Sequence, residues 1–244
     1  MPSLEGWLLL GVGAIVASTI GGVAGFGAGV IMLPLIAWTL GIKATVPVLT
    51  VAMLLGNGAR VWFSRTEVDG RVVAAFLVGA VPSGIGGALL YARIEGEWIS
   101  RILGTFMLAA VPLRRWLSGH RVRVRLGHFP LVGGLFGCLS SLVGAVGPIM
   151  SPFFLNYGLR KGAYIATDAL CSVGMYVARG VVFQKHDLMT GPTVAAGLYI
   201  GVVMIAGAWA GRRILDRMSE RTFLRLIEAL LILFGLQFLV FPSR

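Results

Sequence analysis

The sequence predicts an all-α integral membrane protein, and its composition, its segment lengths and an internal repeat support that fold class. Of the 244 residues, 57% are hydrophobic and only 13% are charged, and the mean hydropathy is +0.88. Apolar runs of roughly 20 residues recur along most of the chain, a length typical of membrane spans. The longest polar stretch, Arg114–His128, is too short for a soluble domain. We therefore expect a single membrane domain over residues 1–244.

Two apolar segments interrupted by glycine define the plan of the predicted helices. In the first half, Trp7–Ile20 is followed by a glycine break and a shorter helix over Val30–Leu40. The turn at Lys43 and the polar turn Arg65–Arg71 then separate the next spans, which we expect over Ala44–Phe63, Val72–Tyr91 and Trp98–Trp116. The second half repeats this order over Phe129–Val143, a break, Pro148–Tyr157, and spans at Ala163–Phe183, Thr190–Ala210 and Phe223–Phe241.

The two halves keep the same register, which indicates an internal duplication. The first break runs from Gly25 to Pro34 and the second from Val143 to Pro152, 118 residues later. At this offset Lys, Gly and Asp residues coincide in the pairs Lys43/Lys161, Gly56/Gly174 and Asp69/Asp187. We expect repeat 1 over residues 1–118 and repeat 2 over residues 128–244. Glycine interruptions at corresponding positions of two halves indicate the binding site of a transporter.

The distribution of Lys and Arg favours two re-entrant hairpins over two kinked spans. If each broken segment crossed the membrane once, nine basic residues would lie on each side. If each broken segment turns back, the halves are inverted, with three crossings each, and thirteen basic residues lie opposite five. Cytoplasmic loops carry the Lys/Arg excess, so this topology places both termini outside. The returning helix over Val30–Leu40 would be roughly 16 Å long, about half of a ~30 Å hydrocarbon core.

Two helices that begin inside the membrane would form an anion site. The returning helices are expected to begin near Gly29 and Gly147, where unpaired N–H groups and the helix dipole attract negative charge. Glycines let the backbone approach a ligand closely, which makes the break glycines binding candidates: Gly25, Gly27, Gly29, Gly144 and Gly147. The alternative is that glycines only allow close helix packing, which we expect for Gly84, Gly86, Gly87, Gly133, Gly134 and Gly207.

Polar residues inside the predicted spans are the remaining site candidates. Asn57 and Arg60 lie in the span after the first break, and Asp168 and Arg179 in its counterpart. The arginines could bind an anion through several donors or extend to the membrane surface. Asp168 is a candidate for proton coupling or for a structural ion pair. The hydroxyls of four residues could line the cavity or bond to their own helix: Ser140, Ser141, Thr167 and Ser172.

Charged residues elsewhere are expected to be structural. Glu228, in the last predicted span, is expected to pack against a basic partner, and the charged stretch Arg114–Arg125 to be solvated. The net charge of +11 resides almost wholly in loops and at helix ends, which favours contact with anionic lipid head groups over nucleic acid.

The break Gly25–Gly29 with Pro34, the Lys43 turn, the Arg65–Arg71 turn and the duplicated plan resemble the sulfite exporter TauE/SafE family of membrane permeases. The resemblance covers essentially the whole chain. It implies transport of a small sulfur oxyanion or organosulfonate across the bacterial inner membrane, with a proton or sodium ion as the coupling ion. It implies no oligomeric state.

An intramembrane enzyme and an accessory subunit without transport are the alternatives. An enzyme would need a nucleophile–base pair or a metal cluster. The three histidines, His120, His128 and His186, lie in or beside loops, and none has metal-ligand spacing to another ligand. The sequence contains no phosphate-binding loop for a nucleotide. We therefore expect neither enzymatic activity nor a cofactor or metal.

Overall fold

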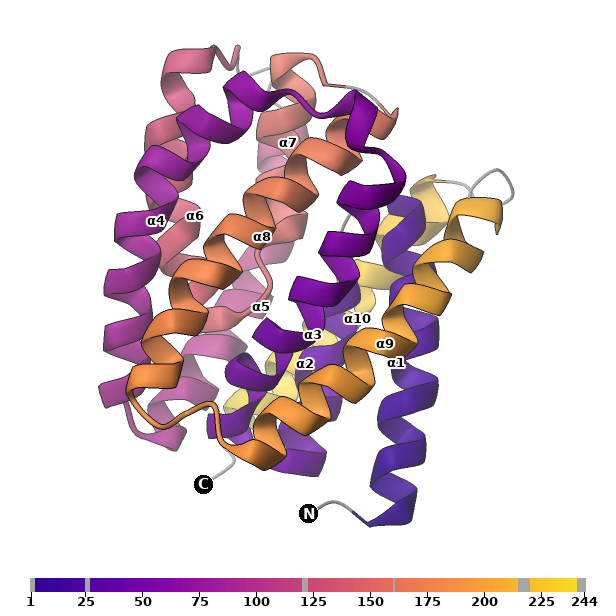
Figure 1. The fold of residues 1–244 in the computed structure, drawn as a ribbon, viewed down its shortest axis with the longest axis vertical. Coiled ribbons are helices and arrows are strands. Elements are labelled where there is room, and N and C mark those ends of the chain that lie inside the picture. Colours follow the sequence, from indigo (N-terminus) through magenta and orange to yellow (C-terminus); the bar gives the residue numbers. More distant parts are fainter. Residues whose placement is uncertain (1–2, 25–26, 120–122, 160, 215–219, 241–244) are drawn as a thin grey trace.

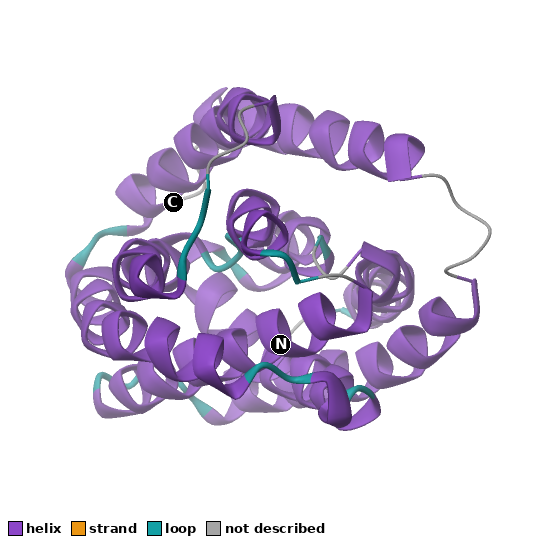
Figure 2. Cartoon of the chain, turned by 90° about the horizontal axis from the view of Figure 1, so that it is seen from above, coloured by secondary structure: helices purple, strands orange, loops and turns teal. Residues whose placement is uncertain are grey.

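The chain is α-helical throughout the part described by the computed structural model, which covers all residues except 1–2, 25–26, 120–122, 160, 215–219 and 241–244. No strand occurs in these ranges (Figure 2). The helices of the first half are α1 (Leu4–Ala24), α2 (Ala28–Leu40), α3 (Ile42–Phe63), α4 (Gly70–Arg93) and α5 (Gly96–Gly119). Those of the second half are α6 (Phe129–Val143), α7 (Gly147–Tyr157), α8 (Lys161–Lys185), α9 (Gly191–Ile214) and α10 (Glu220–Val240). The predicted all-α fold class is confirmed.

Local sequence explains where several helices begin and end. Asp69 caps α4, because its carboxylate accepts hydrogen bonds from the backbone N–H groups of Arg71 and Val72 at 3.0 and 3.2 Å. Gly158 ends α7 with a φ of 113°, a left-handed conformation that glycine adopts without steric cost. Gly41, with a φ of 87°, reverses the chain between α2 and α3.

Six described helices are long and apolar enough to cross a membrane, as expected of a multi-pass membrane protein. They are α1, α3, α4, α6 together with the 3₁₀ turn Leu126–His128 before it, α8 and α9, and this set differs from the predicted spans. α5 falls outside it because Arg101, Arg114 and Arg115 interrupt its apolar character. The first helix is longer than the predicted Trp7–Ile20: α1 has 21 residues, or about 31 Å. Gly21 and Gly22 continue this helix, since membrane helices tolerate glycine.

Each broken segment folds into an antiparallel helix pair. A pocket brings Ser3 and Gly6, at the start of α1, next to Trp38 and Thr39 at the end of α2. In the second half the rings of Phe129, at the start of α6, and Tyr157, at the end of α7, meet edge-to-face at 5.3 Å. Each pair therefore returns to the end of the molecule at which it starts (Figure 1).

Most of the helix packing joins one half of the chain to the other. α4 packs on α6 and, correspondingly, α9 packs on α1; α3 packs on α9 as α4 packs on α8. The remaining large contacts, α3 with α8 and α5 with α10, join helices at equivalent positions of the two halves. Exchanging the halves thus reproduces these six helix pairs.

Glycines make the α4–α6 contact exceptionally close. A Cβ on Gly133 would overlap the carbonyl oxygen of Phe76, and one on Gly79 would overlap that of Pro130. Close backbone approach through small residues is typical of packed membrane helices. The packing role predicted for Gly134 and Gly86 is wrong, because no described atom lies within 4 Å of a Cβ at either position.

This difference predicts opposite effects for adjacent substitutions. Gly133→Leu should prevent the α4–α6 contact and strongly reduce the yield of folded protein, since the new side chain displaces backbone. Gly134→Leu is the matched control and should fold like the wild type. The measurement is the monodisperse fraction on size exclusion and the thermal midpoint in detergent. Equal values for the two variants would contradict this packing.

Candidate functional site

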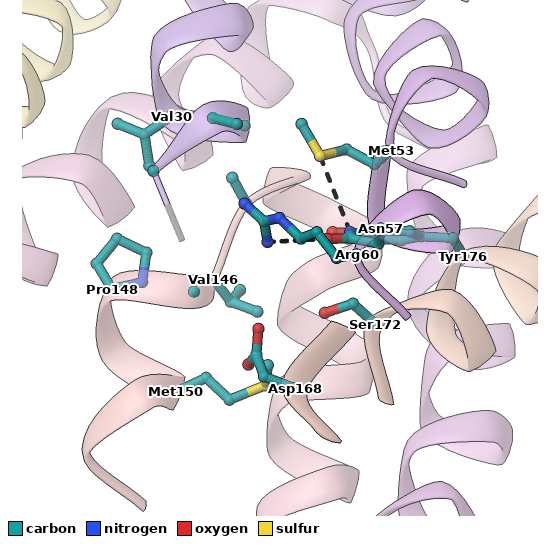
Figure 3. A pocket seen from close by; sticks show the side chains of 15 residues that line it. Val30, Met53, Asn57, Arg60, Val146, Pro148, Met150, Asp168, Ser172 and Tyr176 are labelled. Atoms are coloured by element: carbon teal, nitrogen blue, oxygen red, sulfur yellow. Dashed lines mark hydrogen bonds between the residues drawn. The ribbon is translucent and has the colours of Figure 1, made fainter. Parts of the chain in front are cut away.

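A cavity lies where the starts of α2 and α7 meet α3 and α8 (Figure 3). Its volume is about 40 Å³, whereas one water needs only ~10–15 Å³. The cavity can therefore hold a ligand of a few atoms. Its walls are formed by Gly27, Ala28, Gly29, Val30, Met53, Asn57, Arg60, Ala145, Val146, Gly147, Pro148, Met150, Asp168, Ser172 and Tyr176.

The two helix starts face the same space and touch one another. Gly27 precedes α2 with a φ of 104°, a conformation that favours glycine. A Cβ on Gly29 would lie only 2.8 Å from the Cβ of Ala145, in the break before α7. Pro148 occupies the first turn of α7, where its missing N–H is not needed. The first N–H groups of α2 have no partner within the helix and can donate to a ligand. In α7 the N–H groups of Ile149 and Met150 donate to the Val146 carbonyl at 3.1 and 3.0 Å, so the Gly147 N–H is the donor that its start can offer.

Helix α3 contributes an arginine held in place on the cavity wall. The Arg60 guanidinium donates from Nη1 to Asn57 Oδ1 at 3.0 Å and from Nη2 to the Gly21 carbonyl oxygen at 2.6 Å. Asn57 is buried. In Figure 3 the guanidinium points into the space between Val30, Val146 and Pro148. Arg60 therefore places a positive charge beside both helix starts.

Helix α8 contributes a buried carboxylate to the same cavity. Asp168 is 4% exposed, and its Oδ1 has no hydrogen-bond partner within the described part of the chain. Burying a polar atom without a partner is costly. The carboxylate therefore calls for a proton, a cation or a ligand donor. Ser172 and Tyr176 lie four and eight residues further along the same helix face, and both line the cavity.

Arg179 neither lines this cavity nor reaches the surface. It is fully buried, donates to Thr50 Oγ1 at 2.8 Å and Ser140 Oγ at 3.1 Å, and also donates to the Ser140 carbonyl oxygen. Its guanidinium carbon lies 4.4 Å from the centre of the Tyr176 ring. The side chain therefore ties α8 to α3 and α6.

The two arginines make equivalent bonds in the two halves. Arg60 donates to the carbonyl of Gly21 near the end of α1, and Arg179 to that of Ser140 near the end of α6. Both relations match the 118-residue offset to within one position. Carbonyl groups at helix ends need partners at membrane depth, and the Ser140 carbonyl accepts from the Gly144 N–H at 2.9 Å in addition to Arg179. The arginines thus stabilise the ends of the two helices that precede the breaks.

The other predicted site residues fall into three groups. Gly27, Gly29, Asn57, Arg60, Gly147 and Asp168 lie on the cavity wall, and Gly25 lies outside the described residues. Ser141 donates to the carbonyls of Gly84 and Gly137 at 2.8 and 3.1 Å, so it contributes to packing. Gly144 ends α6 with a φ of 78° and faces Leu33 and Leu49. Ser140 binds Arg179 instead of lining the cavity.

Several wall residues were not predicted, and helical spacing could have found some of them. Tyr176 follows Asp168 by eight residues, with the predicted candidate Ser172 midway between them, and Met53 precedes Asn57 by four. Residues at this spacing share one face of a helix. Val146 and Met150 carry no comparable signal, because apolar residues surround them in the sequence.

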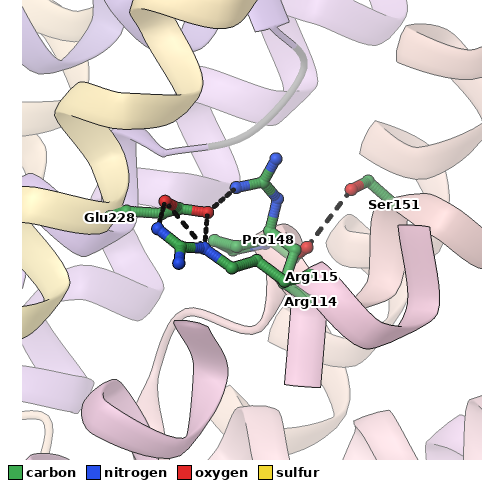
Figure 4. A network of polar contacts seen from close by, with 5 residues as sticks. All are labelled: Arg114, Arg115, Pro148, Ser151 and Glu228. Atoms are coloured by element: carbon green, nitrogen blue, oxygen red, sulfur yellow. Dashed lines mark hydrogen bonds and ion pairs between the residues drawn. The ribbon is translucent and has the colours of Figure 1, made fainter. Parts of the chain in front are cut away.

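The predicted basic partners of Glu228 are confirmed in a second polar cluster, between α5 and α10 (Figure 4). The Glu228 carboxylate accepts from Arg114 Nη1 at 3.1 Å and from Arg115 Nη2 at 2.6 Å. Arg114 is only 7% exposed, so the expectation of a solvated charge is wrong at this position. Its pairing with Glu228 makes that burial possible. The cluster lies beside Pro148 at the start of α7 in Figure 4.

No curated protein and no solved structure matches this chain. The family model described as sulfite exporter TauE/SafE matches residues 9–238. Because this match covers nearly the whole chain, the protein belongs to the sulfite exporter TauE/SafE family, whose members are membrane transporters of small sulfur-containing anions and not enzymes.

Proposed function

We propose that the protein is a secondary transporter that moves a small sulfur oxyanion or organosulfonate across the bacterial inner membrane through the cavity between α2 and α7. The observation that carries this proposal is the presence of both helix starts and Arg60 on the wall of one cavity. These groups supply hydrogen-bond donors and positive charge at a single point.

Arginine contacts make the electrostatics of the breaks favourable to an anion. Each break brings the negative end of one helix close to the positive start of the next. Arg60 and Arg179 donate to carbonyls near the ends of α1 and α6 and so offset those negative ends. The starts of α2 and α7 are then free to attract an anion.

The size of the cavity favours a compact substrate. A volume of about 40 Å³ suits an oxyanion such as sulfite better than an extended organosulfonate. The walls match this chemistry, since backbone N–H groups, Arg60 and Asn57 provide donors on one side and Val30, Val146 and Met150 exclude water on the other. Few polar groups in an apolar pocket are typical of small-molecule sites.

The carboxylate of Asp168 suggests how transport is coupled to an ion. A charged carboxylate in the same small cavity would repel an anion, so the anion binds when Asp168 carries a proton or holds a sodium ion. The charged and titratable neighbours are Arg60 from α3 and Tyr164, Cys171 and Tyr176 from α8 itself. Of these neighbours, Arg60 carries the positive charge that attracts both the anion and the Asp168 carboxylate.

Asp168→Asn should therefore uncouple the transport of the anion from the flux of the proton or sodium ion. We expect the variant to bind sulfite at least as well as wild type, because the repulsive charge is gone. We also expect it to lose the dependence of sulfite flux on an imposed proton or sodium gradient. Counterflow in reconstituted vesicles, with and without each gradient, checks this. A variant that retains the full gradient dependence would exclude Asp168 as the coupling group.

The reciprocal helix pairs support two inverted repeats with the hairpins as re-entrant elements. In this arrangement the side with thirteen Lys and Arg residues is cytoplasmic and both termini are outside. Labelling of single cysteines at Ser3 and Thr66 with an impermeant reagent in intact cells tests the orientation. Labelling only at Ser3 is expected. Labelling only at Thr66 would show that the protein has the opposite orientation in the membrane.

Transport itself is tested in liposomes with labelled sulfite, thiosulfate and a short organosulfonate. Saturable sulfite flux, competed by the anions that fit the cavity, is the expected result. A folded protein that moves none of these anions would overturn the proposal and leave the role of an accessory subunit.

A further inference from the structure

A second, apolar groove runs along the outer face of α3 and α8. It has a volume of about 440 Å³, within the usual range of ligand pockets, about 300–1,000 Å³. Val51 and Leu54 of α3 form one wall, and Val177 and Val181 of α8 form the other. The side chains of Val177 and Val181 are about half exposed, at 52% and 53%. The groove is therefore open towards the lipid.

The groove has the length and direction of a lipid chain. It begins at Lys185, the last residue of α8, and extends to Tyr176. These nine steps along a helix correspond to roughly 13 Å, close to half of a ~30 Å hydrocarbon core. It thus spans one leaflet, from the end of the helix to the middle of the membrane.

The ends of the groove differ in chemistry. At the outer end Gln184 and Lys185, both exposed, line the groove through their apolar atoms, and the Lys185 side chain carries a positive charge beyond it. His186 and Asp187 follow in the turn, but neither lines the groove. A basic residue at the membrane surface attracts anionic head groups.

The inner end of the groove adjoins the proposed anion site. Tyr176 lines both the groove and the central cavity, and its ring lies under the Arg179 guanidinium at 4.4 Å. A chain packed in the groove would therefore contact the side chain that forms a wall of the cavity.

We propose that this groove binds one acyl chain of an anionic phospholipid, with the head group at Lys185 and the chain packed against Tyr176. The bound lipid holds Tyr176 in place and so supports the cavity wall. Lipid binding itself is independent of which anion is transported, whereas its effect on the cavity depends on the proposed function.

Filling the groove provides the test. A Cβ on Gly180 would make ordinary contacts of 3.7 Å with Met189 and 3.8 Å with Thr50, so Gly180→Leu can be accommodated and its side chain occupies the groove. Gly86→Leu is the matched control, since no described atom lies within 4 Å of a Cβ there and Gly86 is exposed on α4. Lys185→Gln removes the charge alone.

The full-length protein is delipidated in detergent, titrated with phosphatidylglycerol or phosphatidylcholine, and examined by native mass spectrometry. Wild type and Gly86→Leu should retain one phosphatidylglycerol, and Gly180→Leu should bind it about tenfold more weakly. Lys185→Gln should lose the preference for phosphatidylglycerol over phosphatidylcholine. If Gly180→Leu does not fold, Val181→Phe fills the same groove from an exposed position.

Wild-type affinity in the folded groove-filling variant would overturn the proposal, as would a dimer mass without bound lipid, since a second copy would then cover this face. Sulfite binding is measured on the same samples. Loss of lipid with unchanged sulfite affinity would remove the link through Tyr176 and leave the anion site intact. Absence of sulfite binding in wild type, with lipid retained, would instead count against the proposed function alone.

Discussion

Replacing Arg60 by glutamine is expected to raise the Kd for sulfite by about 10- to 100-fold, because hydrogen bonds to charged groups contribute about 1.5–3 kcal/mol each. Arg60 is the cationic side chain on the cavity wall, beside the starts of α2 and α7. Its distance of 3.0 Å to Asn57 Oδ1 fixes the orientation of the guanidinium. Titration calorimetry on purified protein measures the effect.

Arg60→Lys is the informative control for that experiment. Lysine keeps the charge but not the planar set of donors that arginine provides, so an intermediate affinity is expected. The bond to the Gly21 carbonyl is also lost in the glutamine variant, and the thermal midpoint without sulfite reports that separate contribution. Unchanged sulfite affinity in folded Arg60→Gln would show that this side chain does not bind the substrate.

Replacing Arg179 by leucine is expected to affect folding instead of substrate affinity. The guanidinium is fully buried and donates to Thr50 and Ser140. Its loss would leave buried acceptors on α3 and α6 without donors, at a cost of about 1–3 kcal/mol each. Since proteins are stable by only about 5–15 kcal/mol, much of the stability would disappear. The yield of monodisperse protein and the thermal midpoint are the measurements.

Arg101→Leu provides the comparison for that prediction. Arg101 pairs with Glu97 on the same helix, and its side chain is 51% exposed. Exposed pairs of this kind contribute about 0.3–0.5 kcal/mol, so this variant should retain nearly the wild-type midpoint. A folded Arg179→Leu protein with reduced sulfite affinity would contradict the structural role and indicate that Arg179 binds the anion.

The sequence predicts several residues of the central cavity, but it does not predict which distant helices contact one another. The glycine breaks were found because their spacing is repeated 118 residues apart. Asn57, Arg60 and Asp168 were found because polar residues are rare in apolar segments. These signals arise from one residue or one short motif, so they can be read without knowledge of the packing.

Features that depend on contacts between distant segments could not be predicted in this way. Arg60 and Arg179 look alike in the sequence, but only Arg60 lines the cavity. The burial of Arg114 depends on Glu228, more than a hundred residues away. The full length of α1 was missed because a glycine pair has the same local appearance inside a helix as at its end.

The most direct test of an anion site at the opposed helix starts is a sulfite-dependent thermal shift of two glycine variants. Gly29→Leu would place a side chain where the two breaks approach within 2.8 Å, whereas no described atom lies within 4 Å of a Cβ at Gly58. A ligand at a hundred times its Kd stabilises the folded state by about 2.7 kcal/mol. We predict this shift in wild type and Gly58→Leu and its absence in folded Gly29→Leu. A shift of wild-type size in Gly29→Leu would contradict the proposed site.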